Sequence, residues 1–312
     1  MSPLHSTAVA SILPPMLKFT ITATDHCRQV ASFLRNLLPA APLPYLKKLL
    51  RSEHLALNGQ PAAPTALLAV GDSVTIKESG RTRGFLAASP PAIDILHEDD
   101  RIVIVNKPAG VAVHRTAEAG DDNLVELAER FMVERGTPVK LRPVNRLDRG
   151  TSGATILAKS ATSAGMFGRF VKEEGLGKLY LAVAEGTMPP DGEIAIPLDG
   201  KESLTRHRLL FQGGAEAFVA LYPVTGRTHQ IRKHLSLIGH PVRGDRRYGG
   251  SPLPGYPGHL LHAFRVSLRH PETGRELSVY APLPSGFVAA VQEVAGEEFL
   301  PLLRGLPALP PA

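Results

Sequence analysis

One acidic residue, Asp148, lies between two arginines and is followed at once by a turn and an apolar run. The segment reads Asn-Arg-Leu-Asp-Arg-Gly-Thr-Ser-Gly over residues 145–153, and the apolar residues 154–158 come next. A carboxylate on a loop that leads into a buried strand is well placed to lie at the floor of a cleft. Arg146 and Arg149 would favour the ionised carboxylate and could also bind phosphate groups. The segment therefore predicts a reactive acid beside a site for a polyanion.

Two more clusters of polar and aromatic residues follow this segment. Residues 178–180 read Lys-Leu-Tyr, and residues 225–232 read Thr-Gly-Arg-Thr-His-Gln-Ile-Arg. Each residue taken alone has a plain structural explanation: Tyr180 could pack in a core, and Arg232 could interact with a helix C-terminus. The ordered set of clusters favours a functional site over these explanations.

The composition predicts a folded protein with an anionic partner. The chain has 312 residues, of which 43% are apolar, and this is enough for a catalytic domain and a small additional module. Lys and Arg number 35 against 29 Asp and Glu, which gives a net charge of +6 and a sequence pI of 9.5. A positive balance of this size suggests an anionic partner such as nucleic acid.

The location expected from the sequence is the cytoplasm. Cys27 is the only cysteine, so no intramolecular disulfide can form, which fits a reducing compartment. We interpret Cys27 as a packed or surface thiol and not as a nucleophile. The first fifteen residues lack the basic start and the apolar run of a signal peptide. No stretch approaches the ~20 apolar residues that span a bilayer, so we expect no membrane association.

The N-terminal region predicts two helices. Apolar residues recur with helical spacing over 28–38, and a second helix fits 44–52, where Lys47, Lys48 and Arg51 lie mostly on one side. A basic helix pair followed by short strands resembles the small RNA-binding domain that ribosomal protein S-four shares with several RNA-modifying enzymes. The resemblance implies that the three basic residues contact RNA. The alternative is a solvated helix face.

Short strands and a linker complete this region. Strands are predicted at 55–57 and 73–77, with a tight turn at Asn58-Gly59. The small RNA-binding domain then spans residues 16–78. Residues 79–92 are rich in Gly and Pro, and we expect them to form a linker.

Residues 93–300 show a mixed order of strands and helices that does not repeat a βα unit. This order predicts an α+β fold, with a mixed, mostly antiparallel catalytic sheet, flanking helices and a central cleft, beside a small N-terminal α/β module. The Pro- and Ala-rich residues 301–312 are expected to be a loose tail. The expected strands are 102–105, 179–184, 217–222, 266–268 and 277–280, and the expected helices are 123–134, 163–172 and 229–237.

The clusters, taken in order, resemble the RluA-type family of pseudouridine synthases. The resemblance covers roughly residues 93–285. Five ordered motifs make it specific, although each motif alone is weak. The motifs are residues 95–100, residues 105–110, the Asp148 segment, residues 178–180, and residues 225–232 with the His and Gly residues that follow. The resemblance implies isomerisation of uridine to pseudouridine in structured RNA: the N-glycosidic bond breaks, the base turns, and the base rejoins through carbon.

The resemblance also implies a role for each of five residues. Asp148 is the nucleophile or charge stabiliser, and attack at the ribose and formation of a glycal both remain open. Arg232 pairs with this acid and holds it ionised. Tyr180 stacks on the target base and can act as a base itself. Ile231 is an apolar wall for the uracil, and Arg146 fills the space left by the flipped nucleotide.

Further residues are expected to contact the substrate. Arg227 and His229 are assigned to RNA binding, with a phosphate contact favoured for His229. Residues 201–249 carry an excess of basic residues, as expected for a positive rim around an RNA-binding cleft. Arg206, His207 and Arg208 are the expected outer contacts.

Asn145 departs from the family pattern, which usually has a histidine at this position. Asparagine can still hydrogen-bond a backbone or phosphate group, but it cannot carry charge. Because Asn145 neighbours Asp148 without being the nucleophile, we expect activity to survive and substrate choice to differ.

The partners and cofactors follow from the reaction. Nothing enters or leaves in the isomerisation, so no cofactor and no metal is required, and the histidines near His229 lack zinc spacing. The expected partner is RNA, with large-subunit ribosomal RNA favoured and transfer RNA open, and the chain is expected to be a monomer. Two alternatives are a non-catalytic RNA-binding ribosome-assembly factor and a glycosidase, which would need a second catalytic acid near Asp148.

Overall fold

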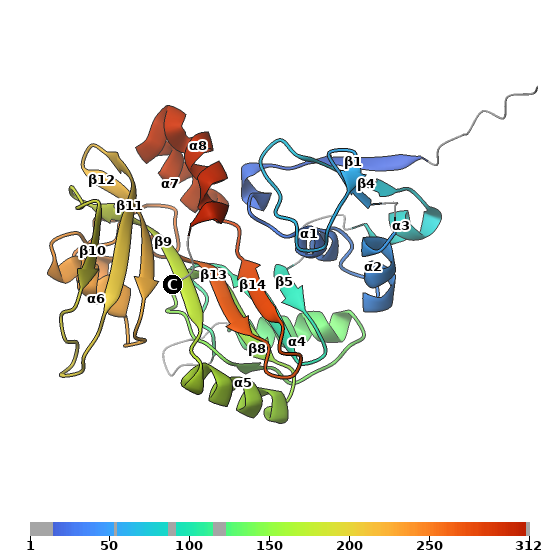
Figure 1. Ribbon diagram of the computed structural model, residues 1–312, viewed down its shortest axis with the longest axis horizontal. Coiled ribbons are helices and arrows are strands. Elements are labelled where there is room, and N and C mark those ends of the chain that lie inside the picture. The colour runs from blue at the N-terminus through green and yellow to red at the C-terminus, as the bar shows by residue number, and fades with distance from the viewer. Residues whose placement is uncertain (1–14, 53–54, 87–91, 115–122, 310–312) are drawn as a thin grey trace, which may run out of the picture.

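The computed structural model describes residues 15–52, 55–86, 92–114 and 123–309 (Figure 1). In these residues the strands form two sheets, one of four strands and one of ten. The small sheet belongs to the N-terminal region, and the large sheet belongs to the region that carries Asp148. The α+β class predicted from the sequence is confirmed. No helix in the described part of the chain is long and apolar enough to cross a membrane.

The N-terminal module combines two helices with the four-stranded sheet, whose strand order is β1-β4-β2-β3. Its elements are β1 (Met16–Thr20), α1 (Val30–Leu37), α2 (Leu43–Leu50), β2 (Leu55–Leu57), β3 (Gln60–Pro61) and β4 (Ser73–Lys77). The helix pair is confirmed, and so is the turn: Asn58 and Gly59 have φ values of 52° and 78°, as a two-residue hairpin loop requires. Strand β1 was not predicted, because its apolar residues do not stand apart from the preceding segment.

The linker prediction for residues 79–92 is wrong in its first half. Residues 80–85 form helix α3 (Gly80–Phe85), and the Ser79 side chain caps it by accepting a hydrogen bond from Thr82 N at 3.0 Å. The Tyr45 hydroxyl lies 2.9 Å from Thr82 Oγ1, and the Tyr45 ring meets Phe85 edge to face. The segment therefore packs on α2 as part of the module. Residues 87–91 of the predicted linker lie outside the described residues.

The large sheet runs in the order β10-β11-β12-β9-β13-β8-β6-β5, with β14 paired to β13 and β7 paired to β8. Its pairs are antiparallel except for β8 with β13, which is parallel. Four helices flank it (Figure 1): α4 (Leu124–Glu134), α5 (Ala161–Glu173), α6 (Gln230–Leu237) and α7 (Ser285–Ala295). The strands are β5 (Ile95–Glu98), β6 (Ile102–Lys107), β7 (Arg142–Pro143), β8 (Ser152–Ala158), β9 (Gly177–Glu185), β10 (Asp191–Ile194), β11 (Thr205–Gly213), β12 (Glu216–Pro223), β13 (Leu261–Arg269) and β14 (Glu276–Tyr280).

The contact between β8 and β13 explains a glycine directly after the Asp148 loop. Gly153 has φ of +116° and lies opposite Ala263 in the parallel pair. A Cβ atom at this position would lie 2.4 Å from the Ala263 carbonyl oxygen and 2.6 Å from its nitrogen. Only glycine allows this backbone conformation and this close approach. The loop that carries Asp148 is thereby brought against the centre of the sheet.

The prediction of a loose tail for residues 301–312 is also wrong for the residues that the structure describes. Helix α8 (Phe299–Gly305) and a 3₁₀ turn, η4 (Leu306–Ala308), continue the fold. Phe299, Leu303 and Leu306 are buried in the same core as Phe287 of α7, because their spacing of four and three residues puts them on one helix face. Residues 310–312 lie outside the described residues.

This core also contains Cys27, which the sequence analysis interpreted as a packed or surface thiol. Cys27 is fully buried among residues of α7, β9 and β12, so the packed alternative is correct. Burial raises the pKa of its thiol to about 12, and the thiol is therefore unreactive at neutral pH.

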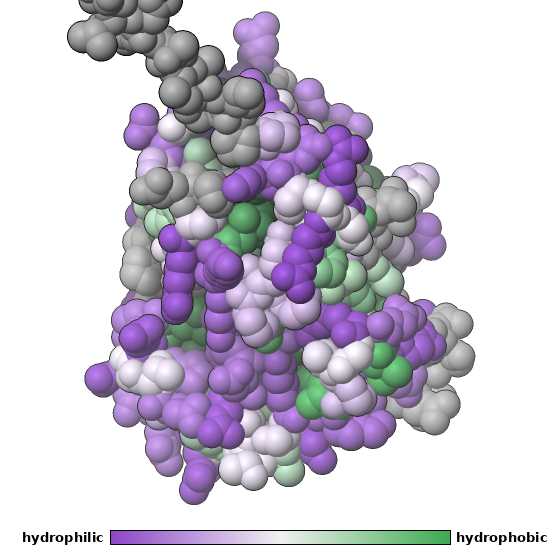
Figure 2. All heavy atoms as spheres, turned by 90° about the vertical axis from the view of Figure 1, so that its right-hand side faces the viewer, coloured by the Kyte–Doolittle hydropathy of each residue, from purple (hydrophilic) through white to green (hydrophobic). Residues whose placement is uncertain are grey.

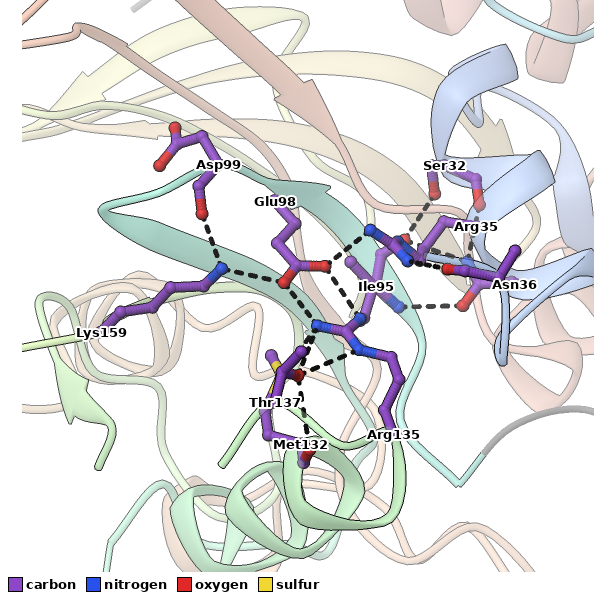
Figure 3. A network of polar contacts seen from close by, with 11 residues as sticks. Ser32, Arg35, Asn36, Ile95, Glu98, Asp99, Met132, Arg135, Thr137 and Lys159 are labelled. Carbon is purple, nitrogen blue, oxygen red and sulfur yellow. Dashed lines mark hydrogen bonds and ion pairs between the residues drawn. The ribbon is translucent and has the colours of Figure 1, made fainter. Parts of the chain in front are cut away.

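The N-terminal module is joined to the catalytic sheet by polar contacts between α1 and β5. Arg28 donates two hydrogen bonds to Asp94, at 2.5 and 3.0 Å, and Ser32 Oγ donates to the Ile95 carbonyl at 2.8 Å. Next to them the Arg35 guanidinium pairs with Glu98 at 3.0 Å (Figure 3). The face of the molecule that carries this module is mostly hydrophilic, with small apolar patches (Figure 2).

Candidate active site

One cavity of about 380 Å³ contains every site residue that the sequence predicts in the catalytic region, and this size is typical of a small-ligand site. Lys47, Lys48 and Arg51 are not among its lining residues; they lie exposed on or just after α2 of the N-terminal module. The predicted residues that line it are Arg146, Asp148, Tyr180, Arg227, His229, Ile231 and Arg232.

Asn145 fixes the start of the Asp148 loop to strand β8. Its side-chain oxygen accepts a hydrogen bond from Ile156 N at 2.7 Å, and its amide donates to the Ala154 carbonyl at 3.3 Å. Of the two partners expected for this side chain, backbone or phosphate, the structure shows backbone. Asn145 therefore supports the loop from outside the reacting groups.

The end of the loop rests on two buried histidines. Thr151 Oγ1 lies 2.8 Å from His259 Nε2, and Ser152 Oγ lies 2.8 Å from His262 Nδ1. His262 Nε2 donates to the Ala281 carbonyl at 2.9 Å, so its Nδ1 accepts the proton of the Ser152 hydroxyl. Burial lowers the pKa of both imidazoles to about 4, and both are neutral at pH 7.

A buried lysine holds the loop from the opposite side. The Lys107 ammonium donates to the carbonyl groups of Pro108, Val111 and Arg149 at 2.9, 2.7 and 3.1 Å. Burial lowers the pKa of Lys107 to about 7, although the nearby negative charge of Asp148 opposes this shift. The side chain ties residues 107–111 to the residue that follows Asp148.

Arg232 is the direct partner of Asp148. Its Nη1 donates to Asp148 Oδ2 at 2.9 Å, while Nε and Nη2 donate to the two oxygens of Asp245 at 2.6 and 2.8 Å. Burial disfavours the charged guanidinium, but the two carboxylates outweigh it and raise the pKa of Arg232 further. The same arginine holds the pKa of the buried Asp245 carboxyl below its usual range, against the effect of burial.

His229 faces the other oxygen of Asp148. His229 Nε2 lies 3.6 Å from Asp148 Oδ1, and His229 Nδ1 lies 2.8 Å from the Tyr248 hydroxyl. Burial lowers the pKa of His229, and the positive charge of Arg232 adds to this effect while Asp148 opposes it. Two different groups therefore approach the two carboxylate oxygens, and only Arg232 is close enough for a hydrogen bond.

Apolar and aromatic side chains form the wall opposite the acid. Tyr180 packs against Leu147, which is mostly buried, and Ile231 and Leu261 line the same cavity. Burial raises the pKa of Tyr180, and the negative charge of Asp148 raises it further. A phenol that stays protonated at neutral pH fits the stacking role better than the role of a base.

A second cavity, of about 490 Å³, shares Arg146, Asp148, Arg227 and His229 with the first. His114 and the exposed Arg149 also line it, and Arg149 Nε donates to the Gly110 carbonyl at 2.8 Å. Among the described residues that line this cavity, three arginines, Arg146, Arg149 and Arg227, lie beside a single carboxylate, Asp148, and give it a positive excess. Asp148 thus lies between an apolar-walled cavity and a cationic one.

A model of the RNA pseudouridylate synthase family matches residues 101–237, which include Asp148, Tyr180 and Arg232. The chain is 30% identical to a ribosomal large subunit pseudouridine synthase D from Neisseria meningitidis serogroup B, over 81% of this chain and 75% of that protein. The chain belongs to the RluA-type family of RNA pseudouridine synthases. Membership supports an enzyme over the non-catalytic RNA-binding alternative.

Another relative aligns with this chain over nearly its full length. A ribosomal large subunit pseudouridine synthase C from Escherichia coli K12 is 29% identical, over 90% of this chain and 97% of that protein. Among solved structures, human RNA pseudouridylate synthase domain containing 4 is 25% identical, with a TM-score of 0.55 over 64% of this chain and 92% of that chain. Human RNA pseudouridylate synthase domain containing 1 is 26% identical, with a TM-score of 0.51.

Several residues that shape the site of this synthase were not predicted from the sequence. Asp245 and Tyr248 follow the 225–232 motif, and nothing in the sequence links them to Arg232. Lys107 belongs to the motif at 105–110 and Lys178 to the motif at 178–180, but neither was given a role, although Lys178 lines the cavity, where burial lowers its pKa. A lone charged residue in a strand carries no sequence signal of burial, which explains both lysines.

Two expectations about nearby residues are corrected. His207 is buried on β11, because alternate residues of a strand point to opposite faces and its neighbours Arg206 and Arg208 occupy the outer one. These two arginines are exposed and paired with Glu193 and Asp191.

The glycosidase alternative lacks its second acid: among the described residues that line the two cavities, Asp148 is the only carboxylate.

Proposed function

We propose that this pseudouridine synthase modifies uridines in large-subunit ribosomal RNA, with Asp148 as the catalytic carboxylate. The observation that carries the assignment is the placement of one carboxylate between an aromatic wall and a buried arginine. The choice of RNA rests on the relatives, whose names state that they act on the ribosomal large subunit. A transfer RNA substrate is the alternative outcome of the experiment below.

The proposed reaction starts at the glycosidic bond. Asp148 either attacks C1′ of the ribose or removes the 2′ proton to form a glycal, and in both cases the bond from C1′ to N1 of uracil breaks. The uracil leaves with the bond electrons, turns, and attacks C1′ through C5. In the first route this attack breaks the bond between Asp148 and C1′, and in the second route Asp148 returns the proton to C2′. Loss of the C5 proton and protonation of N1 complete the isomerisation, so atoms and charge balance without any co-reactant.

Each wall of the cavity has a proposed part in this sequence. Tyr180 stacks on the uracil, and Ile231 limits its movement while the base is free. Arg232 holds the Asp148 carboxylate in place through one charge-assisted hydrogen bond. Arg146, which is exposed and lines both cavities, occupies the space that the flipped nucleotide leaves.

The cationic second cavity and the N-terminal module are proposed to hold the rest of the RNA. Arg227 and His229 border the second cavity, where neighbouring phosphates of the flipped uridine would meet positive charge. Lys47, Lys48 and Arg51 lie exposed on one side of the module. We propose residues 16–86 as this RNA-binding module, residues from 92 on as the catalytic domain, a monomer as the active form, and the cytoplasm as its location.

The assignment is tested by mapping pseudouridine in RNA from cells that lack the protein, after incubation with the purified enzyme. Wild-type protein should restore pseudouridine at one or a few positions of large-subunit ribosomal RNA. Asp148→Asn should give no product and bind RNA as before. Asp199→Asn, which changes an exposed acid paired with Lys233, is the control and should be fully active.

Three results would contradict parts of the proposal. Normal product from Asp148→Asn would show that another group is the catalytic acid. Product in transfer RNA alone would replace the ribosomal assignment and leave the chemistry intact. A charge reversal of Lys47, Lys48 and Arg51 together should raise KM by about tenfold or more and flatten its salt dependence, so an unchanged KM would remove the module from RNA binding.

A further inference from the structure

The turn that contains Asp245 and Tyr248 contacts both groups that face Asp148. Asp245 is only 2% exposed, and its two carboxylate oxygens are bound by Nε and Nη2 of Arg232. Tyr248 lies three residues later, with its ring centre 4.9 Å from the Arg232 guanidinium carbon and its hydroxyl 2.8 Å from His229 Nδ1. One short turn therefore touches the partner of each Asp148 oxygen.

The Arg232 contacts leave only one nitrogen for Asp148. A guanidinium binds carboxylates best through two parallel hydrogen bonds, so a free arginine next to Asp148 would bind both of its oxygens. Asp245 already occupies the edge formed by Nε and Nη2, and Nη1 alone reaches Asp148, at Oδ2. Asp148 Oδ1 is then left without an arginine hydrogen bond and borders the cavity.

His229 is held in an uncommon backbone conformation. It precedes helix α6 with φ of 55°, in the left-handed region that costs a non-glycine residue about 1 kcal/mol or more. In this conformation its ring meets Tyr248 edge to face, and Nε2 points toward Asp148 Oδ1. The Tyr248 hydroxyl hydrogen-bonds the other ring nitrogen of His229.

The turn itself is firmly fixed to the sheet. Asp245 O accepts hydrogen bonds from the backbone nitrogens of Tyr248 and Gly250 at 3.0 and 2.9 Å. A Cβ atom on Gly250 would lie 2.1 Å from the Val242 carbonyl, and Val242 bridges to Ala184 of β9. Asp245 and Tyr248 are thus presented by a rigid segment, as a positioning role requires.

We infer that Asp245 and Tyr248 are positioning residues for pseudouridine formation, which keep Arg232 on one oxygen of Asp148 and His229 next to the other. Asp245 blocks the two-bond pairing of Arg232 with Asp148 and leaves Oδ1 available to the ribose. Tyr248 aims His229 at that oxygen. This inference rests on the proposed role of Asp148.

The first test is Asp245→Asn in the full-length enzyme, assayed for pseudouridine with varied RNA concentration and with the concentration of folded enzyme measured in each preparation. We expect kcat to fall by about tenfold to a hundredfold while KM changes less than threefold, because no RNA contact is removed. A purely structural role of Asp245 would lower the amount of folded enzyme and leave kcat per folded molecule unchanged.

A double-mutant comparison tests whether Asp245 acts through Arg232. Lysine is a point charge that cannot form the two-bond pair, so in an Arg232→Lys background the Asp245→Asn change should cost less than half of its effect in wild type. Equal, additive effects on kcat would overturn the inference.

Tyr248→Phe keeps the inference testable if Asp245→Asn fails to fold. The ring over Arg232 remains and only the hydroxyl on His229 is lost, so kcat should fall about threefold to tenfold with KM unchanged. Tyr222→Phe is the matched control, because within the described residues the buried Tyr222 hydroxyl has no hydrogen-bond partner; it should leave kcat unchanged. A Tyr248→Phe enzyme as active as wild type at every pH would overturn the role of Tyr248.

The outcomes separate the inference from the function on which it rests. If wild-type protein forms no pseudouridine, or Asp148→Asn is active, the proposed function is wrong. If wild type is active, Asp148→Asn is inactive, and both Asp245→Asn and Tyr248→Phe match wild type, only the inference is wrong.

Discussion

Two carboxylates in this protein, Glu98 and Asp148, are both surrounded by positive charge, yet their surroundings differ in one respect. Glu98 has a side chain that is 2% exposed and is paired with Arg35, Arg135 and Lys159 at 3.0, 2.5 and 2.8 Å (Figure 3). Asp148 has a side chain that is 27% exposed, and within the described residues it receives one hydrogen bond, from Arg232. Both oxygens of the Glu98 carboxylate are paired with cations, whereas in the described part of the chain only one oxygen of Asp148 accepts a hydrogen bond from a cation.

The difference separates a structural acid from a reactive one. Three cations on Glu98 leave its lone pairs no capacity for a new bond, and they hold its pKa low against the effect of burial. Arg35 comes from α1, so Glu98 joins the N-terminal module to the catalytic sheet. At Asp148 the nearest cation takes one oxygen, and the other oxygen remains free for chemistry in the cavity.

The largest expected effect is the loss of activity in Asp148→Asn. Product formation should fall by about 10³-fold or more, because the amide can neither attack nor remove a proton. The free energy of unfolding should change by less than about 1 kcal/mol, since the side chain is partly exposed and has one direct partner. Single-turnover kinetics and urea unfolding measure the two quantities. A large loss of stability would show that Asp148, like Glu98, has a structural role.

The opposite result is expected for Glu98→Gln. Removal of this charge leaves three cations close together and mostly buried, which should lower the free energy of unfolding by about 3–5 kcal/mol. The kcat of the protein that remains folded should stay within about twofold of wild type at low temperature. Chemical denaturation with active-site titration checks both. If kcat falls sharply in folded Glu98→Gln enzyme, the two carboxylates are not independent.

As the pH falls, the two histidines that hold the end of the Asp148 loop should become protonated before the cations around Glu98 change their charge. His259 and His262 have pKa values lowered from 6.5 to about 4 by burial, so the unfolded chain binds their protons at higher pH than the folded protein. Their contribution is complete above pH 6.5 and is lost as the pH falls toward 4, by up to about 3 kcal/mol for each histidine. Arg35, the cation that α1 contributes to Glu98, has a pKa lowered by burial to about 10 and stays charged throughout this range.

This pH dependence can be measured by urea unfolding between pH 7.5 and 4.5. The slope of stability against pH should be smaller in His262→Gln than in wild type by the equivalent of one proton. Hydrogen exchange should report earlier opening of β8 and β13 than of α1. An equal slope in the variant and the wild type would contradict the buried, neutral state of His262.

The smallest effect is expected for Asn145→Ala. The change removes the acceptor of Ile156 N and the donor to the Ala154 carbonyl, which should destabilise the protein by about 1–2 kcal/mol. The loop that carries Asp148 is then less well held, so kcat should fall by less than tenfold with little change in KM. A loss of activity as large as that of Asp148→Asn would give Asn145 a direct part in the chemistry.

The sequence allowed the members of the site to be predicted but not their connections. Asp148, Tyr180 and Arg232 occur in ordered motifs, and the pairing of Arg232 with Asp148 was implied by the family resemblance. Asp245 lies thirteen residues after Arg232 with a turn between them, and no periodicity joins the two positions. The contact between Asp245 and Arg232 depends on how the chain folds back after α6, and this cannot be predicted from the local sequence pattern.

The fold was predictable where apolar residues form a clear pattern. The strand at 102–105 was predicted from a continuous apolar run, and the helix at 123–134 from apolar residues that recur with helical spacing. Strand β11 was missed, because exposed arginines alternate along it with residues that are not strongly apolar. Helices α3 and α8 were missed because Gly, Pro and Ala content was given more weight than the cap at Ser79 and the apolar face of α8.

The contacts between α1 and β5 have a consequence for the choice of substrate. Gln29 also donates to the Ser278 carbonyl at 3.1 Å, and the His26 ring bonds the Leu303 carbonyl, so the module is held at several separate points. The distance between the basic residues of α2 and Asp148 is then fixed. If an RNA element binds on α2, only a uridine at the same distance from that element in the folded RNA can enter the cavity. The position of a uridine in the RNA fold would then contribute to substrate choice together with the nucleotides around it.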